Sequence, residues 1–327
     1  MIIAIPDDYH GMVGKLDCIA KLSGHDVRIF HDVAPAAHRL LGHLREADVI
    51  VPIRERTVFT REIVERLPNL KLFSQTGRST HHIDKAACTE RGIVVSAGSK
   101  ESVYTVAEHT WALILAARRH IPEDDALMRR GALRSSFSGS LRGATLGIYG
   151  LGKIGRLVAA TGASFSMKVL VYGREASVAA ARAAGYAVAA SKDELFEQSD
   201  VLCAMLRLSD ATRGIITAND LARMKPTALF VNTARAALVA PGALAAALKR
   251  GRPGFAAVDV YENEPVVNAD HPLLGMGNTL CTPHTAWLEQ PTYELYFGEA
   301  FDNVVAFIGG TPVNVVNPEA LPGRKKA

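Results

Sequence analysis

Three titratable residues in the second half of the chain, Arg235, Glu264 and His284, each follow a predicted strand. Hydride reduction of a 2-oxo acid needs a cation that holds the carboxylate and polarises the carbonyl, and an acid that protonates the developing alkoxide. Arginine, permanently charged and fork-shaped, suits the first task, and histidine, which titrates near neutrality, suits the second. A glutamate beside the histidine can orient it and stabilise its charged form. Taken singly, each residue also fits an ordinary structural place: a surface arginine, a helix-capping glutamate or a buried histidine.

A glycine motif, Gly150-x-Gly152-x-x-Gly155, joins a predicted strand at 146–149 to a predicted helix at 153–160. In a dinucleotide-binding loop the first glycine makes the tight turn, the second lets the backbone approach a pyrophosphate, and the third lets helix and strand pack closely. The helix N-terminus then offers free N–H groups and the positive end of its dipole. Such a motif alone also occurs in ordinary glycine-rich turns, but the flanking strand and helix favour a dinucleotide site. The predicted cofactor contacts are Gly150, Gly152, Lys153, Ile154 and Gly155.

The residues after the next predicted strand, 168–172, bear on the choice of cofactor. NAD is usually held here by an acidic residue that accepts hydrogen bonds from the ribose 2′-hydroxyl. This chain has Gly173 and Arg174 instead. Without a carboxylate there is no repulsion of a 2′-phosphate, and a guanidinium donates charge-assisted hydrogen bonds to it. We therefore expect NADP to be favoured, with NAD possible if Glu175 reaches the ribose.

A polar loop at 76–84 follows a predicted strand at 70–73. Open α/β sheets bind ligands beyond the carboxyl ends of their strands, so this loop is a candidate substrate site. A surface loop with a helix N-cap is the alternative. The candidate substrate-binding residues are Thr76, Gly77, Arg78 and Ser79.

Short apolar runs alternate with helical patterns along the whole chain, which predicts βαβ units and parallel sheets with helices on both faces. The predicted strands are 2–5, 26–30, 48–51, 70–73 and 93–95, and then 146–149, 168–172, 200–205, 228–231 and 256–260. We therefore expect two doubly wound α/β domains, a Rossmann-type cofactor domain inserted in a flavodoxin-like substrate domain. Residues 1–100 and 290–327 would form the substrate domain, and residues 101–289 the dinucleotide-binding domain.

Several helices are predicted besides the one after the glycine motif. The segment 102–119 is apolar nearly all round, which predicts a helix buried between the domains. We interpret Glu108 and His109 in it as hydrogen-bonded structural groups. Alanine-rich tracts at 179–190 and 243–247 are predicted to be helical, as is 292–308. The segment 311–318 is predicted to be extended and to pack on the first domain.

The composition is that of a soluble globular protein, with 327 residues, 48% of them hydrophobic and 21% charged. The net charge is +4, but Lys and Arg are scattered, and the one basic run, 324–326, is read as a solvated end. The four cysteines lie far apart with no histidine at metal-ligand spacing, so we expect reduced thiols and no metal. No signal peptide and no apolar run of about 18 residues is present. We expect a cytoplasmic protein that binds neither nucleic acid nor membrane.

Several motifs in order closely resemble the D-isomer-specific 2-hydroxyacid dehydrogenase family, and the resemblance runs over most of the chain. The family pattern K-P-x-A-x-x-x-N-x-x-R-G-x-x-V resembles residues 225–239, and D-V-x-x-x-E-P matches 259–265. Further matches are H-P-L-L at 271–274, T-P-H at 282–284 and the segments 105–109, 199–201 and 310–317. Several ordered motifs are far more specific than one glycine loop.

This resemblance implies an NAD(P)-dependent reductase of a small 2-oxo acid, such as glyoxylate or hydroxypyruvate, that forms a homodimer. It implies that Arg235 is the cation that binds the substrate, that His284 is the general acid/base, and that Glu264 is the partner of His284. It also implies that Asp259 contacts the nicotinamide carboxamide and that Thr233 lies at the cofactor. The loop around Gly77 would offer backbone N–H groups to the substrate carboxylate.

The chain departs from the family pattern at four places, which leave the substrate open. Ala236 replaces the glycine after the arginine, and Met205-Leu206-Arg207 replaces the usual His-x-Pro and adds a cation. The substrate loop reads Gly77-Arg78-Ser79-Thr80, whereas Gly-x-Gly is common in the family. Thr285-Ala286-Trp287 replaces the glycines after the histidine, and Trp287 is expected to shape the pocket.

Two other functions remain open. One is a nucleotide-sensing binding protein, like the corepressors related to this family, which the joint presence of Arg235, Glu264 and His284 disfavours. The other is phosphoglycerate dehydrogenase, whose feedback-regulated form is disfavoured because the chain ends at residue 327 without a regulatory domain. Formate dehydrogenase is disfavoured by Glu264, since that enzyme carries Gln beside its His.

Overall fold

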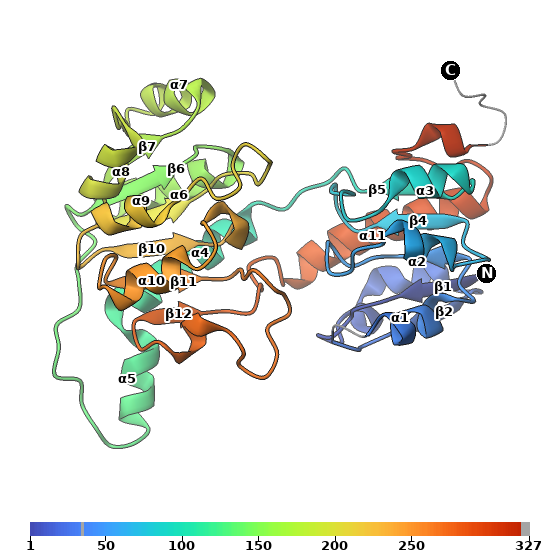
Figure 1. Cartoon of the computed structure of the whole chain (residues 1–327), viewed down its shortest axis with the longest axis horizontal. Coiled ribbons are helices and arrows are strands. Elements are labelled where there is room, and N and C mark those ends of the chain that lie inside the picture. Colours follow the sequence, from blue (N-terminus) through green and yellow to red (C-terminus); the bar gives the residue numbers. More distant parts are fainter. Residues whose placement is uncertain (34–35, 322–327) are drawn as a thin grey trace. The chain divides into compact units, whose positions relative to one another are not determined.

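The structure is a computed structural model that describes residues 1–33 and 36–321; the basic run 324–326 lies outside them. The chain divides into two compact units (Figure 1). The first unit consists of Met1–Ser102 and Leu288–Ala327, and the second unit of Val103–Trp287. None of the described helices combines the length and the apolar character that crossing a membrane requires.

The first unit is built on a five-stranded sheet in the order β2-β1-β3-β4-β5, in which all neighbours are parallel. Its strands are β1 (Ile2–Ile5), β2 (Asp26–Ile29), β3 (Val49–Ile50), β4 (Leu72–Gln75) and β5 (Val94–Ala97). Its helices are α1 (Ala37–Leu44), α2 (Arg61–Glu65), α3 (Lys85–Glu90) and α11 (Gln290–Ile308), with the 3-10 turns η1 (Val13–Lys15), η2 (Asp17–Leu22) and η5 (Pro318–Ala320). This is the strand order of flavodoxin-like sheets.

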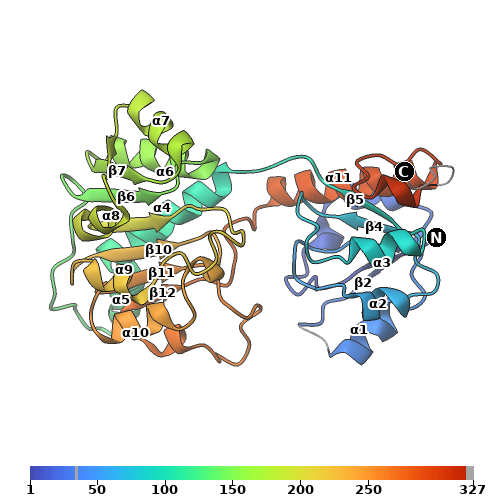
Figure 2. The same cartoon turned by 45° about the horizontal axis from the view of Figure 1, so that its top comes forward.

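Helix α11 and the segment after it return to the first sheet. In Figure 2, α11 runs along the sheet of this unit, and it contacts β4 and β5. Ser74 of β4 donates a hydrogen bond from its hydroxyl to the carbonyl of Ala300, at 2.7 Å. Beyond the helix, the Val316 N–H donates to the Val95 carbonyl (2.8 Å), and the Asn317 side chain accepts from the Val95 N–H (2.7 Å). The prediction that this segment is extended and packs on the first domain is confirmed.

The second unit is built on a seven-stranded sheet in the order β12-β11-β10-β9-β6-β7-β8, again with all neighbours parallel. Its strands are β6 (Thr145–Tyr149), β7 (Lys168–Tyr172), β8 (Ala187–Val188), β9 (Val201–Ala204), β10 (Leu229–Asn232), β11 (Phe255–Val258) and β12 (Thr279–Cys281). Its helices are α4 (Tyr104–Arg119), α5 (Ile121–Met128), α6 (Lys153–Ser164), α7 (Glu175–Ala183), α8 (Lys192–Gln198), α9 (Ala218–Arg223) and α10 (Ala243–Lys249), with η3 (Ala236–Leu238) and η4 (Pro272–Gly275). The order is that of a Rossmann sheet with one strand added, so two doubly wound domains are confirmed.

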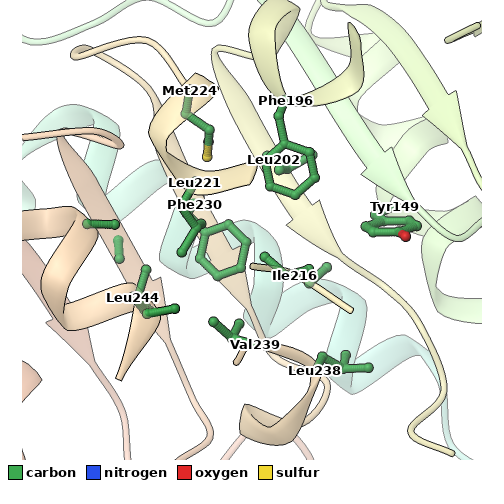
Figure 3. Packing of buried hydrophobic residues seen from close by; sticks show 14 of the residues in the cluster. Tyr149, Phe196, Leu202, Ile216, Leu221, Met224, Phe230, Leu238, Val239 and Leu244 are labelled. Carbon is green, nitrogen blue, oxygen red and sulfur yellow. The ribbon is translucent and has the colours of Figure 1, made fainter. Parts of the chain in front are cut away.

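The strands of the second unit are stabilised by burial of their apolar side chains in its core. Figure 3 shows Phe196 and Phe230, both fully buried, within one apolar cluster that also holds Leu202, Ile216, Leu221, Met224, Leu238 and Leu244. The central strands β6, β9 and β10 are short apolar runs buried on both faces, as expected of a parallel sheet between two helix layers. Helix α4 packs on α6 in the same unit, where the indole N–H of Trp111 donates to the Val158 carbonyl at 3.2 Å. That α4 is also buried between the domains stays a prediction.

Two sequence predictions about this unit were wrong. The tract 179–190 is not one helix, because α7 ends at Ala183 and β8 pairs with β7. Gly185, with φ of +73°, ends the helical course in a conformation that alanine avoids. The alanine content predicted a helix, whereas tertiary pairing decided in favour of a strand. Strand β12 was also missed, because its three residues are too few to show a period.

Candidate active site

The three candidate catalytic residues follow three neighbouring strands of the second unit. Arg235 comes after β10, Glu264 after β11 and His284 after β12. These strands are adjacent and parallel, so their carboxyl ends lie at one edge of the sheet. Ligands of open α/β sheets bind at that edge.

His284 and Glu264 are in direct contact. The Nδ1 of His284 lies 2.5 Å from Oε2 of Glu264, and Oε1 of Glu264 accepts a hydrogen bond from the Tyr261 N–H at 2.7 Å. The glutamate is thus fixed on the backbone through one oxygen and orients the imidazole through the other. With Nδ1 donating to the carboxylate, Nε2 is the nitrogen left for chemistry. His284 also has φ of +54°, a left-handed conformation that is uncommon for non-glycine residues.

A buried carboxylate anchors the loop that carries His284. Asp259 has no exposed surface, and it accepts hydrogen bonds from the Thr282 hydroxyl (2.6 Å) and from the N–H groups of Thr285 and Ala286 (both 2.9 Å). Burial alone would raise the pKa of Asp259, but the hydrogen bonds from His109, Thr282 and the backbone bring it below its usual range. The aspartate is therefore ionised and holds the loop on both sides of the histidine.

His109 completes this network from helix α4. Its Nε2 lies 3.0 Å from the Thr282 hydroxyl and 3.4 Å from Oδ1 of Asp259. Because the single Thr282 hydroxyl proton goes to Asp259, the threonine oxygen must accept, so Nε2 of His109 carries hydrogen. His109 is a hydrogen-bonded structural group, as expected from the sequence. A contact of Asp259 with the nicotinamide carboxamide stays a prediction.

The turn that carries Arg235 is held by Asn232 at the end of β10. The Asn232 amide accepts from the Ala234 N–H (3.1 Å) and donates to the Arg235 carbonyl (3.0 Å). The guanidinium of Arg235 donates to the carbonyl of Ala234 at 2.7 Å. Thr233 of this turn is predicted to lie at the cofactor. Its hydroxyl lies 2.8 Å from the Thr110 hydroxyl, and this hydrogen bond links β10 to α4.

The glycine motif has the geometry that a dinucleotide requires. Gly150, directly after β6, has φ of +95°, and a Cβ there would lie 3.0 Å from the Met205 carbonyl oxygen. At Gly155 a Cβ would lie 2.6 Å from the Gly150 carbonyl oxygen, so only glycine lets α6 approach the strand. At Gly152, the residue before α6, a Cβ would meet no described atom within 4 Å. Open space at the N-terminus of a twelve-residue helix fits a pyrophosphate.

The end of β7 leaves little room for the usual acid. A Cβ at Gly173 would lie 3.0 Å from the Ser177 side chain and 3.5 Å from Cα of Gly150. The Ser177 hydroxyl in turn accepts from the Leu151 N–H at 3.1 Å, which locks α7 onto the glycine motif. Arg174 precedes α7, and both Arg174 and Glu175 are exposed.

The candidate substrate loop lies in the first unit, after β4. Gly77 has φ of +93°, and its carbonyl accepts from the Gly98 N–H at 2.8 Å. The buried Thr76 uses its hydroxyl within the unit, donating to the Pro52 carbonyl at 2.7 Å. Arg78 pairs with Glu101 at 2.5 Å, and the Ser79 hydroxyl lies 2.6 Å from Nδ1 of His81. Substrate contacts by these four residues stay predictions.

Sequence reasoning missed a cation beside this loop, Arg54. A Cβ on Gly77 would lie 3.0 Å from Nη1 of Arg54, and the Arg54 N–H donates to the Thr76 hydroxyl at 2.8 Å. Its guanidinium also lies over the ring of Tyr296, 5.1 Å from the centroid. The available signal was the position of an arginine just after the predicted strand 48–51, the same placement that singled out residues 76–79.

Comparison with known proteins agrees with this geometry. Residues 111–286 match the NAD binding domain of D-isomer specific 2-hydroxyacid dehydrogenases. A glyoxylate reductase from Aeropyrum pernix is 35% identical over 312 residues, which cover 92% of this chain and 92% of that protein. A D-3-phosphoglycerate dehydrogenase from Methanocaldococcus jannaschii is 38% identical over 75% of this chain, but the chain spans only 47% of that protein.

Among solved structures, an oxidoreductase from Ralstonia solanacearum, named as a D-3-phosphoglycerate dehydrogenase, is 49% identical with a TM-score of 0.94. The match covers 98% of each chain. Phosphoglycerate dehydrogenase therefore stays compatible with this chain as the alternative function. The chain belongs to the D-isomer-specific 2-hydroxyacid dehydrogenase family, oxidoreductases that transfer hydride between a nicotinamide cofactor and a 2-hydroxy or 2-oxo acid.

Proposed function

We propose that this protein is an NADP-preferring reductase of small 2-oxo acids in which His284 is the general acid/base. The observation that carries the proposal is the contact between Nδ1 of His284 and Glu264, at 2.5 Å, on the sheet edge that also carries Arg235. A carboxylate at Nδ1 stabilises an imidazolium and directs Nε2–H outward. Such a pair is what protonation of a developing alkoxide requires.

Each residue has a distinct task in this reaction. The nicotinamide cofactor, when bound, supplies the hydride. Arg235 binds the carboxylate and polarises the carbonyl, because its planar fork matches a carboxylate. His284 delivers a proton from Nε2 to the carbonyl oxygen, and Glu264 holds the imidazole in that tautomer. In the oxidation direction the same nitrogen accepts the proton from the hydroxyl group.

The preference for NADP is supported by the end of β7. The Gly173 position lacks a carboxylate, and the space beside it is filled by Ser177. Arg174 is exposed directly before α7, and Arg207 is exposed after β9. A guanidinium is a bidentate donor to phosphate, so we propose that both cations favour the phosphorylated cofactor.

The substrate is proposed to be glyoxylate or hydroxypyruvate. A glyoxylate reductase relative that is 35% identical and matched over 92% of its length supports this choice. Phosphoglycerate dehydrogenase is the second candidate, and the cations Arg54 and Arg78 near the substrate loop support it, because a phosphate ester needs additional positive charge. A corepressor-like sensor would have no use for the oriented His284 and Glu264.

A panel assay tests the proposal. Oxidation of NADPH and of NADH is followed with glyoxylate, hydroxypyruvate, pyruvate and 3-phosphohydroxypyruvate as acceptors. We expect kcat/KM to be highest with NADPH and one of the first two acids. A maximum with phosphohydroxypyruvate would favour the second candidate, and no turnover with any acid would favour a binding protein. A tenfold preference for NADH would contradict the proposed cofactor choice.

We further propose a cytoplasmic homodimer formed through α5 and the segment that follows it. None of the eight residues of α5 is buried, and the apolar side chains Ile121, Met128, Leu133 and Phe137 are exposed. In Figure 1, α5 and the segment up to β6 lie outside the layers of the second unit. An exposed apolar arm of this kind is stabilised when a second copy covers it. The four free cysteines, most of them buried, support a reducing compartment.

A further inference from the structure

One face of α11 is hydrogen-bonded to a segment of the first unit that has no secondary structure, residues 98–102. The Glu299 carboxylate, only 6% exposed, accepts at Oε2 from the N–H groups of Ser99 (2.9 Å) and Lys100 (3.0 Å). Its Oε1 accepts from the Ser99 hydroxyl at 2.5 Å. One turn away on the same face, the Tyr296 hydroxyl accepts from the Ser102 N–H at 3.1 Å. Four donors of this segment are thus satisfied by two side chains.

The Glu299 carboxylate is ionised in this position. Burial would raise its pKa, but the hydrogen bonds from Ser99 and the Lys100 backbone bring it below its usual value. Lys100 adds a favourable charge. A charged acceptor makes stronger and more strongly oriented hydrogen bonds than a neutral one, so the segment is fixed tightly.

The fixed segment lies directly against the candidate substrate loop. A Cβ on Gly98 would lie 2.9 Å from Oε2 of Glu299 and 3.0 Å from the nitrogen of Gly77. Gly98 is therefore wedged between the α11 carboxylate and the loop, and its N–H donates to the Gly77 carbonyl at 2.8 Å. On the other side of the loop, the Arg54 guanidinium packs against Gly77 and over the Tyr296 ring. The α11 face, residues 98–102, Gly77 and Arg54 form one continuous set of contacts.

We propose that Glu299 is a positioning residue for the substrate carboxylate: it holds residues 98–100 against the Gly77 loop and so fixes the donors of that loop and the Arg54 guanidinium. This inference rests on the proposed function, because it assumes that the loop receives a 2-oxo acid. Donors that are held before binding lower the conformational cost of binding. Both carboxylate oxygens of Glu299 are engaged by Ser99 and Lys100, so its loss is expected to weaken substrate binding and to leave the chemical step unchanged.

The replacement Glu299→Gln tests this role with little change of volume. A Gln amide has one acceptor oxygen and directs N–H groups toward the N–H donors of Ser99 and Lys100. We expect KM for glyoxylate or hydroxypyruvate to rise at least fivefold, with kcat within twofold and KM for NADPH unchanged. Ser99→Ala removes only the bond to Oε1 and is expected to raise KM less. The matched control is Asp302→Asn, an exposed carboxylate on the same helix that pairs with Lys21.

A second readout is independent of activity. Amide hydrogen exchange is followed in peptides that cover residues 76–80 and 98–102. Both are expected to exchange faster in Glu299→Gln and at the wild-type rate in Asp302→Asn. Unchanged exchange in Glu299→Gln, or a fall in kcat at constant KM, would overturn the positioning role. A wild-type protein that reduces no acid would instead remove the proposed function, and faster exchange would then still support Glu299 as the residue that holds the loop.

Discussion

At the scale of single residues, the site depends on carboxylates whose oxygens are already bonded before any ligand arrives. Glu264 is fixed by the Tyr261 N–H and orients His284, while Asp259 is fixed by three donors of the histidine loop. In the proposed reaction each carboxylate would therefore position its neighbours rather than react itself. A general acid held in one tautomer and one orientation does not have to be ordered during the reaction.

The first prediction concerns His284. Replacement by Ala removes the proton donor, so kcat for 2-oxo acid reduction should fall about 100- to 10,000-fold while the Kd of NADPH stays unchanged. Steady-state kinetics and fluorescence titration of NADPH measure the two quantities. His271→Asn is the matched control, because His271 also contacts a glutamate, Glu262, at 2.9 Å. Near-normal turnover of His284→Ala would refute the assigned role.

The second prediction concerns the pH dependence of stability. His82 is 4% exposed, its Nδ1 has no hydrogen-bond partner among the described residues, and burial lowers its pKa from 6.5 to about 4. Between these pH values the unfolded chain binds a proton that the folded protein does not, so the free energy of unfolding falls as the pH decreases. The loss is at most about 3 kcal/mol, and it is complete below the folded pKa.

Urea unfolding at pH 7 and pH 4.5 checks this assignment. The His82→Gln variant should lose less stability over that interval than the wild type, because a Gln side chain does not titrate. His81→Gln is the control, since His81 is its exposed neighbour. Equal losses in the wild type and in His82→Gln would show that another group causes the acid sensitivity.

At the scale of elements, the order of strands and helices followed from the sequence, whereas the side-chain partners did not. Buried parallel strands are continuous apolar runs, so most strands were predicted to within two residues, and the two short strands β8 and β12 were missed. Residues directly after a strand were also predictable, which is why Arg235, Glu264 and His284 could be singled out. Arg54 also follows a predicted strand and was overlooked, whereas Glu299 could not be singled out, because its relevance arises from contacts with residues 98–100, about 200 positions away in the sequence.

The third prediction concerns the turn between β7 and α7. The double variant Gly173→Asp, Arg174→Ala introduces the acid that NAD sites use and removes a cation. We expect the ratio of kcat/KM for NADPH to that for NADH to fall about 10- to 100-fold, the worth of one charge-assisted interaction. Because a Cβ at Gly173 lies 3.0 Å from Ser177, the Tm is measured as well. Arg174→Ala alone introduces no such contact, and an unchanged ratio in both variants would place the cofactor choice elsewhere.

At the scale of the whole molecule, the second unit has an apolar surface that the described chain leaves uncovered. This surface is the α5 arm, that is α5 together with the segment 129–144, whose apolar residues Ile121, Met128, Leu133 and Phe137 are exposed. The salt bridge between Arg134 and Asp124, at 2.7 Å, holds the segment after α5 against the helix. The α5 arm therefore has a contact that fixes its segment on its helix, as the proposed interface between two copies would require.

The fourth prediction tests that interface. Phe137 is fully exposed and Leu133 is 87% exposed, so replacing both by Glu costs the single chain little but places charges in an apolar contact. Analytical ultracentrifugation should give a dimer for the wild type and a monomer for the double variant. Val58→Glu, at an exposed apolar residue of the first unit, should remain dimeric. A wild-type monomer at micromolar concentration would contradict the proposal.

Hydride transfer to a 2-oxo acid with His284 as the acid is tested most directly by the configuration of the product. Hydroxypyruvate is incubated with NADPH and either the wild type or His284→Ala, and the glycerate formed is resolved into its enantiomers. The wild type should form D-glycerate in an amount equal to the NADPH consumed, and His284→Ala should form almost none in the same time. Formation of L-glycerate, or NADPH consumption that does not depend on hydroxypyruvate, would contradict the account.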